Sequence, residues 1–382
     1  MKLKDFSPLV FLASLGAGGV AVMPFVLIQY TLDHGKGLIT RSQLWSGGFS
    51  GLTKVYYFSL EAVMIVFTLL HFVLTLWFAI QLVKWMKTDR FSELIQNPLK
   101  NAVILAPLIS LLMTMNLFIG PIRYFIPVLS DNFQSLFLPA MIFWSILFVF
   151  ILWVEIKLLE ISFRKGFDIT KINFGWLLHP FLLGMLTTVG TGIAAMSVNT
   201  TIADTAAFMC LISGSMGIFL LSVKMIILFK SHLKAPGLPE KQFLPSFLIV
   251  IPNITLFAIS AFRLGHYLEH HQGFELGAYF YLVIGLSFAF EIWYMLFGLS
   301  LLKDYFMENH FKEFYVTQWG LICPLVAFVV LGSFAYNIVF ASPILYFIFM
   351  LIMVVTIGFF VELLVKHIRC SRAKSVGLDC EV

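Results

Sequence analysis

The chain has 382 residues, of which 60% are hydrophobic and only 12% charged, and its formal net charge is +5. This apolar surface far exceeds what a soluble core of this size buries, so the composition excludes a water-soluble globular protein and indicates lipid as the solvent. The positive charge does not indicate a nucleic-acid-binding protein, because no folded polar domain is left to carry a basic patch.

Apolar runs of about 20 residues, the length that crosses a hydrocarbon layer of about 30 Å, recur along nearly the whole sequence. The first run, from Leu9 to Tyr30, is too long for the core of a cleaved signal peptide and is expected to remain. The sequence thus predicts an all-α polytopic membrane protein with one transmembrane domain over residues 1–382 and a cytoplasmic tail over 368–382. The predicted spans are residues 8–31, 56–83, 101–126, 134–161, 175–198, 204–230, 244–267, 276–302, 316–340 and 343–367.

The basic residues are distributed unevenly between the two sides of this ten-span arrangement. Of the 25 Lys and Arg residues, 20 fall on one side, and the positive-inside rule assigns that side to the cytoplasm. Both termini are therefore expected in the cytoplasm, with the protein in the plasma membrane, or the inner membrane of a bacterial cell. The remaining five basic residues are Lys36, Arg41, Lys54, Arg123 and Arg263.

Prolines recur at matching places in the odd-numbered spans. Pro107, Pro180, Pro252 and Pro324 follow one another at separations of 73, 72 and 72 residues, whereas Pro24 precedes Pro107 by 83. The even spacing indicates an internal repeat of one helical hairpin. All five prolines are expected to kink their helices, because an interior proline removes a backbone hydrogen bond and frees carbonyl groups.

Freed carbonyls in a membrane need other partners or a wet cavity, so the kinked odd spans are expected inside the bundle. Glycines in the first and fifth spans, in Gly16–Gly19 and Gly190–Ala195, either permit close helix packing or leave room for a pore. Five hairpins with the kinked member inward would give a central passage surrounded by an outer ring of helices.

Two segments of the chain resemble the corresponding segments of a known family. Gln96 to Pro107 is similar to the approach to the third helix of the tellurite-resistance and dicarboxylate transporter family, and Gly237–Glu240 with Phe247–Ile251 would be the corresponding approach to Pro252. That family includes the bacterial tellurite-resistance channel homologue, plant slow anion channels, malate permeases and sulfite exporters. The resemblance implies a quasi-fivefold ring of helical hairpins around a pore, commonly assembled as a homotrimer with one pore per subunit.

The sequence departs from this family in the ninth span. Family members carry a pore-blocking phenylalanine there, whereas this chain reads Trp319-Gly320-Leu321-Ile322-Cys323-Pro324. Cys323 therefore occupies the gate position. A smaller side chain there would leave the pore less occluded, unless another residue supplies the plug.

Candidate pore-lining residues either precede a repeated proline or carry a polar group on an odd span. The imidazole of His179 would bind an anion when protonated, couple transport to protons, or simply be hydrogen-bonded within the packing. The hydroxyl and amide groups would replace part of an anion's hydration shell or bond between helices. The main candidates are Ala106, His179, Ile251, Thr187, Thr191 and Asn253, and the same two interpretations apply to Ser110, Thr114, Asn116, Thr188 and Thr255.

Charged residues within the spans have two interpretations. Glu155, Lys224, Glu291 and Glu362 would pair with groups of neighbouring hairpins or take part in the movement of a coupling ion, and Glu61 belongs with them. The arginines Arg123 and Arg263, at the outward ends of their spans, would attract anions to the pore mouth or extend toward the interface.

One motif suggests an enzyme. His266-Tyr267-Leu268-Glu269-His270 matches the H-x-x-E-H pattern of inverted zinc peptidases, but the sequence offers no clear third ligand, and chance is the favoured explanation. No nucleotide-binding loop is found. We therefore expect no enzyme, no metal and no cofactor.

The sequence favours a channel or passive transporter for small inorganic anions or dicarboxylates, with the odd spans lining the pore. The alternative is a proton-coupled carrier for C4-dicarboxylates such as malate, and a more remote one is a membrane metalloenzyme built on His266, Glu269 and His270.

Overall fold

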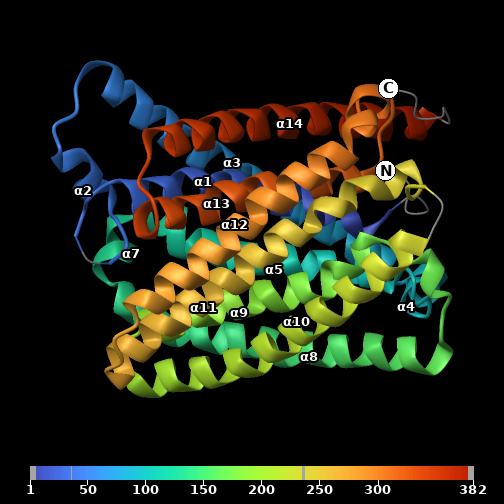
Figure 1. Ribbon diagram of the computed structural model, residues 1–382, viewed down its shortest axis with the longest axis horizontal. Helices are drawn as coiled ribbons and strands as arrows, with labels where there is room; N and C mark the ends of the chain where they lie inside the picture. The colour runs from blue at the N-terminus through green and yellow to red at the C-terminus, as the bar shows by residue number, and fades with distance from the viewer. Residues whose placement is uncertain (1–5, 36, 235–236, 377–382) are drawn as a thin grey trace.

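A computed structural model describes residues 6–35, 37–234 and 237–376 (Figure 1). It is 86% helical, and the described part of the chain contains no strand. The last residues of the expected cytoplasmic tail, 377–382, lie outside the described residues, as do Lys2, Lys4 and Lys36. The α-helices are α1 (Phe11–Thr31), α2 (Arg41–Ser46), α3 (Gly51–Trp85), α4 (Asp89–Ile95), α5 (Ala106–Leu117), α6 (Arg123–Phe125), α7 (Pro127–Asp131), α8 (Phe137–Lys165), α9 (Leu178–Met196), α10 (Thr200–Lys234), α11 (Val250–Gln272), α12 (Gly277–Leu301), α13 (Ile322–Ile338) and α14 (Pro343–Val376).

Ten helical segments of the described residues are long and apolar enough to cross a membrane, which confirms the predicted all-α polytopic class. Shorter 3₁₀ and π segments extend several of them. The ten segments are Pro8–Thr31, Gly51–Trp85, Asn101–Phe125, Phe133–Lys165, Phe174–Met196, Thr200–Lys234, Lys241–Gln272, Gly277–Leu301, Val316–Ile338 and Pro343–Arg372.

The odd-numbered spans lie inside the bundle and the even-numbered spans outside. Between 44% and 100% of the most apolar stretch of each odd span is buried, against 22% to 39% for the even spans. The outer spans expose large apolar side chains, among them Trp77, Phe208 and Phe219, as expected of surfaces that face lipid. In Figure 1, α14 and α8 accordingly form opposite edges of the molecule.

The inner helices contact one another in a closed order. Helix α1 packs against α5 and α13, α9 packs against α5 and α11, and α11 packs against α13. Each outer helix packs on an inner one, for example α3 on α1 and α10 on α9. Every inner helix therefore has two inner neighbours. Small residues also let an outer helix pack closely on an inner one: a Cβ added at Gly190 of α9 would lie 2.2 Å from Trp144 of α8.

All five inner spans begin with a 3₁₀ segment that passes into an α-helix. The four repeated prolines lie at this junction, at the second residue of α5 or the third of α9, α11 and α13, and not in the helix interior as expected. Proline is tolerated in a first turn, where N–H groups lack intrahelical acceptors. Of the five prolines expected to kink their helices, Pro24 alone lies in the interior of an α-helix, within α1. The 3₁₀ segments are Pro8–Val10, Asn101–Leu105, Phe174–Leu177, Lys241–Ile249 and Val316–Leu321.

Candidate functional site

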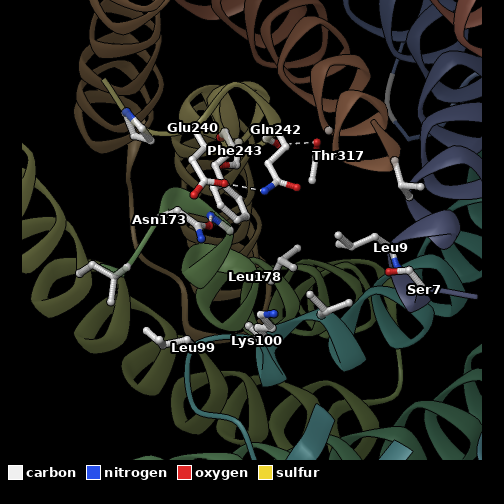
Figure 2. Close-up of a pocket in the computed structure, with 18 of the residues that line it drawn as sticks. Ser7, Leu9, Leu99, Lys100, Asn173, Leu178, Glu240, Gln242, Phe243 and Thr317 are labelled. Atoms are coloured by element: carbon white, nitrogen blue, oxygen red, sulfur yellow. Dashed lines mark hydrogen bonds between the residues drawn. The ribbon is translucent and has the colours of Figure 1, made fainter. Parts of the chain in front are cut away.

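A wide cavity, here called the vestibule, opens where the five inner spans begin (Figure 2). Its volume is about 1260 Å³. Three basic residues (Arg90, Lys100 and Lys171) line it, against the two acidic residues Glu93 and Glu240. This balance favours anions at the vestibule. The hydroxyl of Thr317 donates to the main-chain oxygen of Gln242 at 2.6 Å, which joins the starts of two inner spans across the wall.

A second cavity of about 860 Å³, here called the central cavity, occupies the other part of the inner bundle. All five inner spans contribute to its wall. The wall is largely apolar, with a few polar groups that include Asn116, Thr188, Thr255 and Arg263. An apolar cavity with a small number of convergent polar groups is typical of a site for a small solute.

The vestibule and the central cavity end one helical turn apart. On four inner spans, the last residue of one cavity and the first residue of the other are separated by three positions, or roughly 4.5 Å along a helix. On the remaining span the separation runs from Val103 to Met113. We call this level the constriction. Its paired residues are Leu12 and Leu15, Leu178 and Phe181, Ile249 and Pro252, and Gly320 and Cys323.

Cys323, the expected gate residue, lies at the constriction and is 9% exposed. Phe181 lies at the same level on α9 and is 3% exposed, and the sequence analysis missed it. A signal for it was present, because Phe181 directly follows Pro180 of the proline repeat. The largest side chain at the constriction therefore comes from α9 and not from α13.

Three of the polar candidates, Asn116, Thr188 and Thr255, line the central cavity, whereas six other expected pore-lining residues do not appear in the wall of either cavity. Thr188 and Thr255 face the central cavity, whereas Thr187 donates to Leu183 and contacts Ser213 of α10 at 2.8 Å. The reason is geometric, because successive residues of an α-helix point about 100° apart. The other five candidates, Ala106, His179, Ile251, Thr191 and Asn253, are likewise buried behind the walls.

His179 lies against the outer helix α8. Its Nδ1 is 2.6 Å from a carboxylate oxygen of Glu155, and both side chains are at most 1% exposed. Lys224 of α10 lies nearby, where its ammonium donates to the main-chain oxygen of Trp176 and covers the indole ring. These three ionisable groups thus join α8, α10 and the span that contains α9, and Glu155 pairs with His179.

The remaining acidic residues of the spans also have partners. Thr255 donates to Glu291, which connects the wall of the central cavity to α12. Glu61 accepts hydrogen bonds from Arg41, Trp45 and Tyr124. These contacts support structural pairing of the carboxylates.

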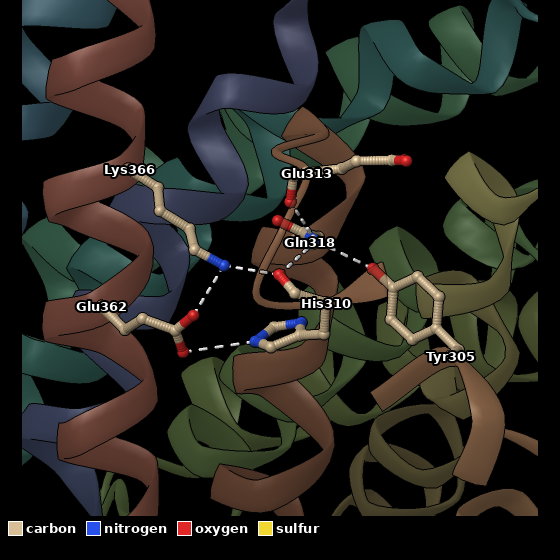
Figure 3. Close-up of polar contacts among 6 residues, drawn as sticks. All are labelled: Tyr305, His310, Glu313, Gln318, Glu362 and Lys366. Carbon is tan, nitrogen blue, oxygen red and sulfur yellow. Dashed lines mark hydrogen bonds and ion pairs between the residues drawn. The ribbon is translucent and has the colours of Figure 1, made fainter. Parts of the chain in front are cut away.

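A polar cluster joins α14 to the chain that precedes α13 (Figure 3). Glu362 lies 2.7 Å from the ammonium of Lys366 and 3.2 Å from Nε2 of His310, and Gln318 donates to Tyr305. His310 lies between two spans, and burial lowers its pKa, although the nearby Glu362 carboxylate opposes this shift. The cluster holds an outer helix against the connection that leads to the constriction.

The two arginines at the outward ends differ in position. Arg123 is 2% exposed and donates to the main-chain oxygens of Ile39 and Ile119, so it supports the loop structure. Arg263 instead lines the central cavity and donates from Nη1 to the main-chain oxygen of Thr188 at 2.7 Å.

The H-x-x-E-H motif lies at the end of α11, also at the central cavity. His266 and Glu269 are 3.1 Å apart, and the rings of His266 and His270 are stacked with centroids at 5.7 Å. Glu269 also accepts from the main-chain N–H of Leu276. Within the described ranges, no group of three His, Cys, Asp or Glu side chains is arranged to hold a metal ion.

Comparison with known protein families identifies one that this chain matches. The family described as "SLAC1: Voltage-dependent anion channel" matches residues 5–368, nearly the whole chain. No curated protein matches the chain.

Proposed function

Because the chain belongs to the voltage-dependent anion channel family, as the resemblance predicted, we propose that it conducts small anions passively through the vestibule, the constriction and the central cavity. Members of this family are anion channels or transporters, which supports a transport function for this chain and not an enzymatic one. The observation that carries the finer proposal is the end-to-end position of the two cavities, one helical turn apart on four inner spans. The closed order of contacts among α1, α5, α9, α11 and α13 supports a quasi-fivefold ring around this path.

The constriction explains how a passage can exist and yet be closed. Leucine, isoleucine and phenylalanine side chains separate the cavities over about one turn, and an apolar constriction excludes ions by dewetting. In the proposed mechanism, a small displacement of the side chains of Phe181 and its neighbours joins the cavities. The basic excess in the vestibule then raises the local concentration of anions over cations.

The test is anion flux in liposomes that contain the purified protein, over a panel of chloride, nitrate, sulfite and malate. We expect flux that is passive and selective for anions. Absence of flux for every anion, from protein that remains monodisperse after reconstitution, would contradict the proposal. Single-channel recording in planar bilayers then separates a channel from a slow carrier.

A proton-coupled C4-dicarboxylate carrier is the second candidate, and the buried pair of His179 and Glu155 is the observation in its favour. An imidazole bonded to a carboxylate can exchange a proton as its surroundings change. Malate uptake that collapses with the proton gradient and with His179→Ala would support the carrier and rule out the passive channel. Large currents that do not respond to a pH gradient would rule out the carrier.

The assembly and the orientation are further proposals. Family resemblance favours a homotrimer with one pore per subunit, which native mass spectrometry would test. The charge distribution favours cytoplasmic termini in the plasma membrane or a bacterial inner membrane, with the vestibule facing the cytoplasm. Labelling of single cysteines introduced at Lys54 and at Lys234 from one side of intact cells would test this orientation.

A further inference from the structure

Arg263 is a cation within the inner bundle that has no acidic partner among the described residues. It lies on α11, lines the central cavity and is half-buried. Among the described residues, no carboxylate oxygen lies within 4.0 Å of its guanidinium nitrogens. Charged side chains inside membrane proteins usually pair with one another or mark the path of a solute. Arg263 is therefore a candidate for contact with a charged solute in the central cavity.

The guanidinium is held in place by its surroundings. Nη1 donates to the main-chain oxygen of Thr188 on α9 at 2.7 Å, and a Cβ at position 192 would lie 3.3 Å from the same nitrogen. Gly192 therefore provides the space in which the guanidinium lies. A guanidinium has five N–H donors in a planar fork, and the bond to Thr188 uses one of them, so donors remain for a ligand in the cavity.

The other charged groups that line the central cavity form no ion pair with Arg263 within 4.0 Å. Glu269 is the one acidic residue that lines this cavity within the described chain, and its carboxylate is engaged by His266 and by the N–H of Leu276. His270 contacts the main-chain oxygen of Ala195. The guanidinium of Arg263 thus lines the central cavity without a direct carboxylate contact from the described chain, and neutral donors such as Asn116 line the same cavity.

We propose that Arg263 forms a binding site for a small planar oxyanion, such as nitrate or a carboxylate group, in the central cavity. The planar fork matches two oxygens of such an anion, whereas a spherical halide engages it less completely. The route by which an anion reaches Arg263 rests on the proposed function. Binding of the anion requires only the central cavity and can be measured without transport.

The experiment is ligand-induced thermal stabilisation of the purified protein in detergent, with nitrate, formate and chloride as sodium salts. A ligand that binds the folded state raises the melting temperature in a saturable way. We expect nitrate and formate to stabilise the wild-type protein at lower concentrations than chloride does. In Arg263→Gln the apparent affinity for nitrate should fall by at least about tenfold, since the charge-assisted hydrogen bonds are lost.

Two further variants sharpen the result. Arg263→Lys keeps the charge but loses the fork, so it should bind nitrate and chloride with similar affinity. Lys54→Gln removes one positive charge from an exposed position outside both cavities and should bind nitrate as the wild type does. Wild-type nitrate affinity in Arg263→Gln, or no saturable stabilisation of the wild-type protein by nitrate and formate, would overturn the site.

The two proposals fail in distinguishable ways. Nitrate binding that depends on Arg263, in a protein that shows no anion flux in liposomes, would overturn the proposed function and leave the site in place. Flux in the wild type together with nitrate binding unchanged by Arg263→Gln would overturn the site and leave the function in place.

Discussion

His179 of α9 and Glu155 of α8 form a buried pair in which Nδ1 of the imidazole lies 2.6 Å from a carboxylate oxygen. The pair links an inner helix to the outer helix that covers it, and Lys224 of α10 extends the link to a third helix through the main-chain oxygen of Trp176. Ionisable groups in the bundle thus serve first to join helices.

This pair gives the first prediction. His179→Ala leaves the carboxylate of Glu155 buried without its donor, and breaking such a pair generally costs about 3–5 kcal/mol. We expect a clear fall in the melting temperature in detergent. The double variant His179→Leu with Glu155→Met should lose less stability than His179→Ala, because neither charge is then left alone. Equal or greater loss in the double variant would contradict a paired role.

The second prediction concerns the constriction. Phe181→Ala removes its largest side chain and should increase anion flux in liposomes several-fold, whereas Cys323→Phe adds a ring at the same level and should decrease it. Phe208→Ala on α10, where the side chain is 64% exposed to the lipid side, is the matched control and should leave flux unchanged. Flux that responds in the same direction to Phe181→Ala and Cys323→Phe would argue against a shared constriction.

The third prediction tests the packing of α9. A Cβ at Gly190 would lie 2.2 Å from Trp144 and 2.5 Å from the sulfur of Cys210. Because overpacking typically costs about 1–3 kcal/mol, Gly190→Ala should lower the melting temperature and the yield of folded protein. Gly358→Ala, in the middle of α14 with no atom within 4 Å of the added carbon, is the control and should be neutral or slightly stabilising. Similar melting temperatures for the two variants would show that α9 can shift to accept the methyl group.

The fourth prediction concerns pH and the cluster of Figure 3. Burial lowers the pKa of His310 in the folded protein below the usual value of 6.5, so as pH falls the unfolded chain binds the proton first. Stability from this group is therefore fully present above about pH 6.5 and decreases as the pH falls below it. The melting temperature of the wild type should fall more between pH 7.5 and 5.5 than that of His310→Gln. Parallel curves for the two proteins would exclude His310 as the titrating group.

Much of the architecture was readable from the sequence alone. Span length and apolar content gave the ten spans, because crossing a hydrocarbon layer imposes a minimum length on any helix. The spacing of Pro107, Pro180, Pro252 and Pro324 indicated a repeat and assigned the odd spans to the interior, which their burial confirms. The same spacing also marks the level of the constriction, since Phe181, Pro252 and Cys323 all lie within one residue of a repeated proline.

The direction of each side chain was decided only by the tertiary structure. A repeat in sequence fixes depth along the helix, but one residue more or less turns a side chain by about 100°, so Thr188 and Thr255 face the central cavity while Thr187 and Asn253 face neighbouring helices. How each helix is rotated depends on packing against its neighbours, as at Gly190. The sequence determined which helices surround the central cavity, and packing determined that Phe181 lies at the constriction and Arg263 in the central cavity.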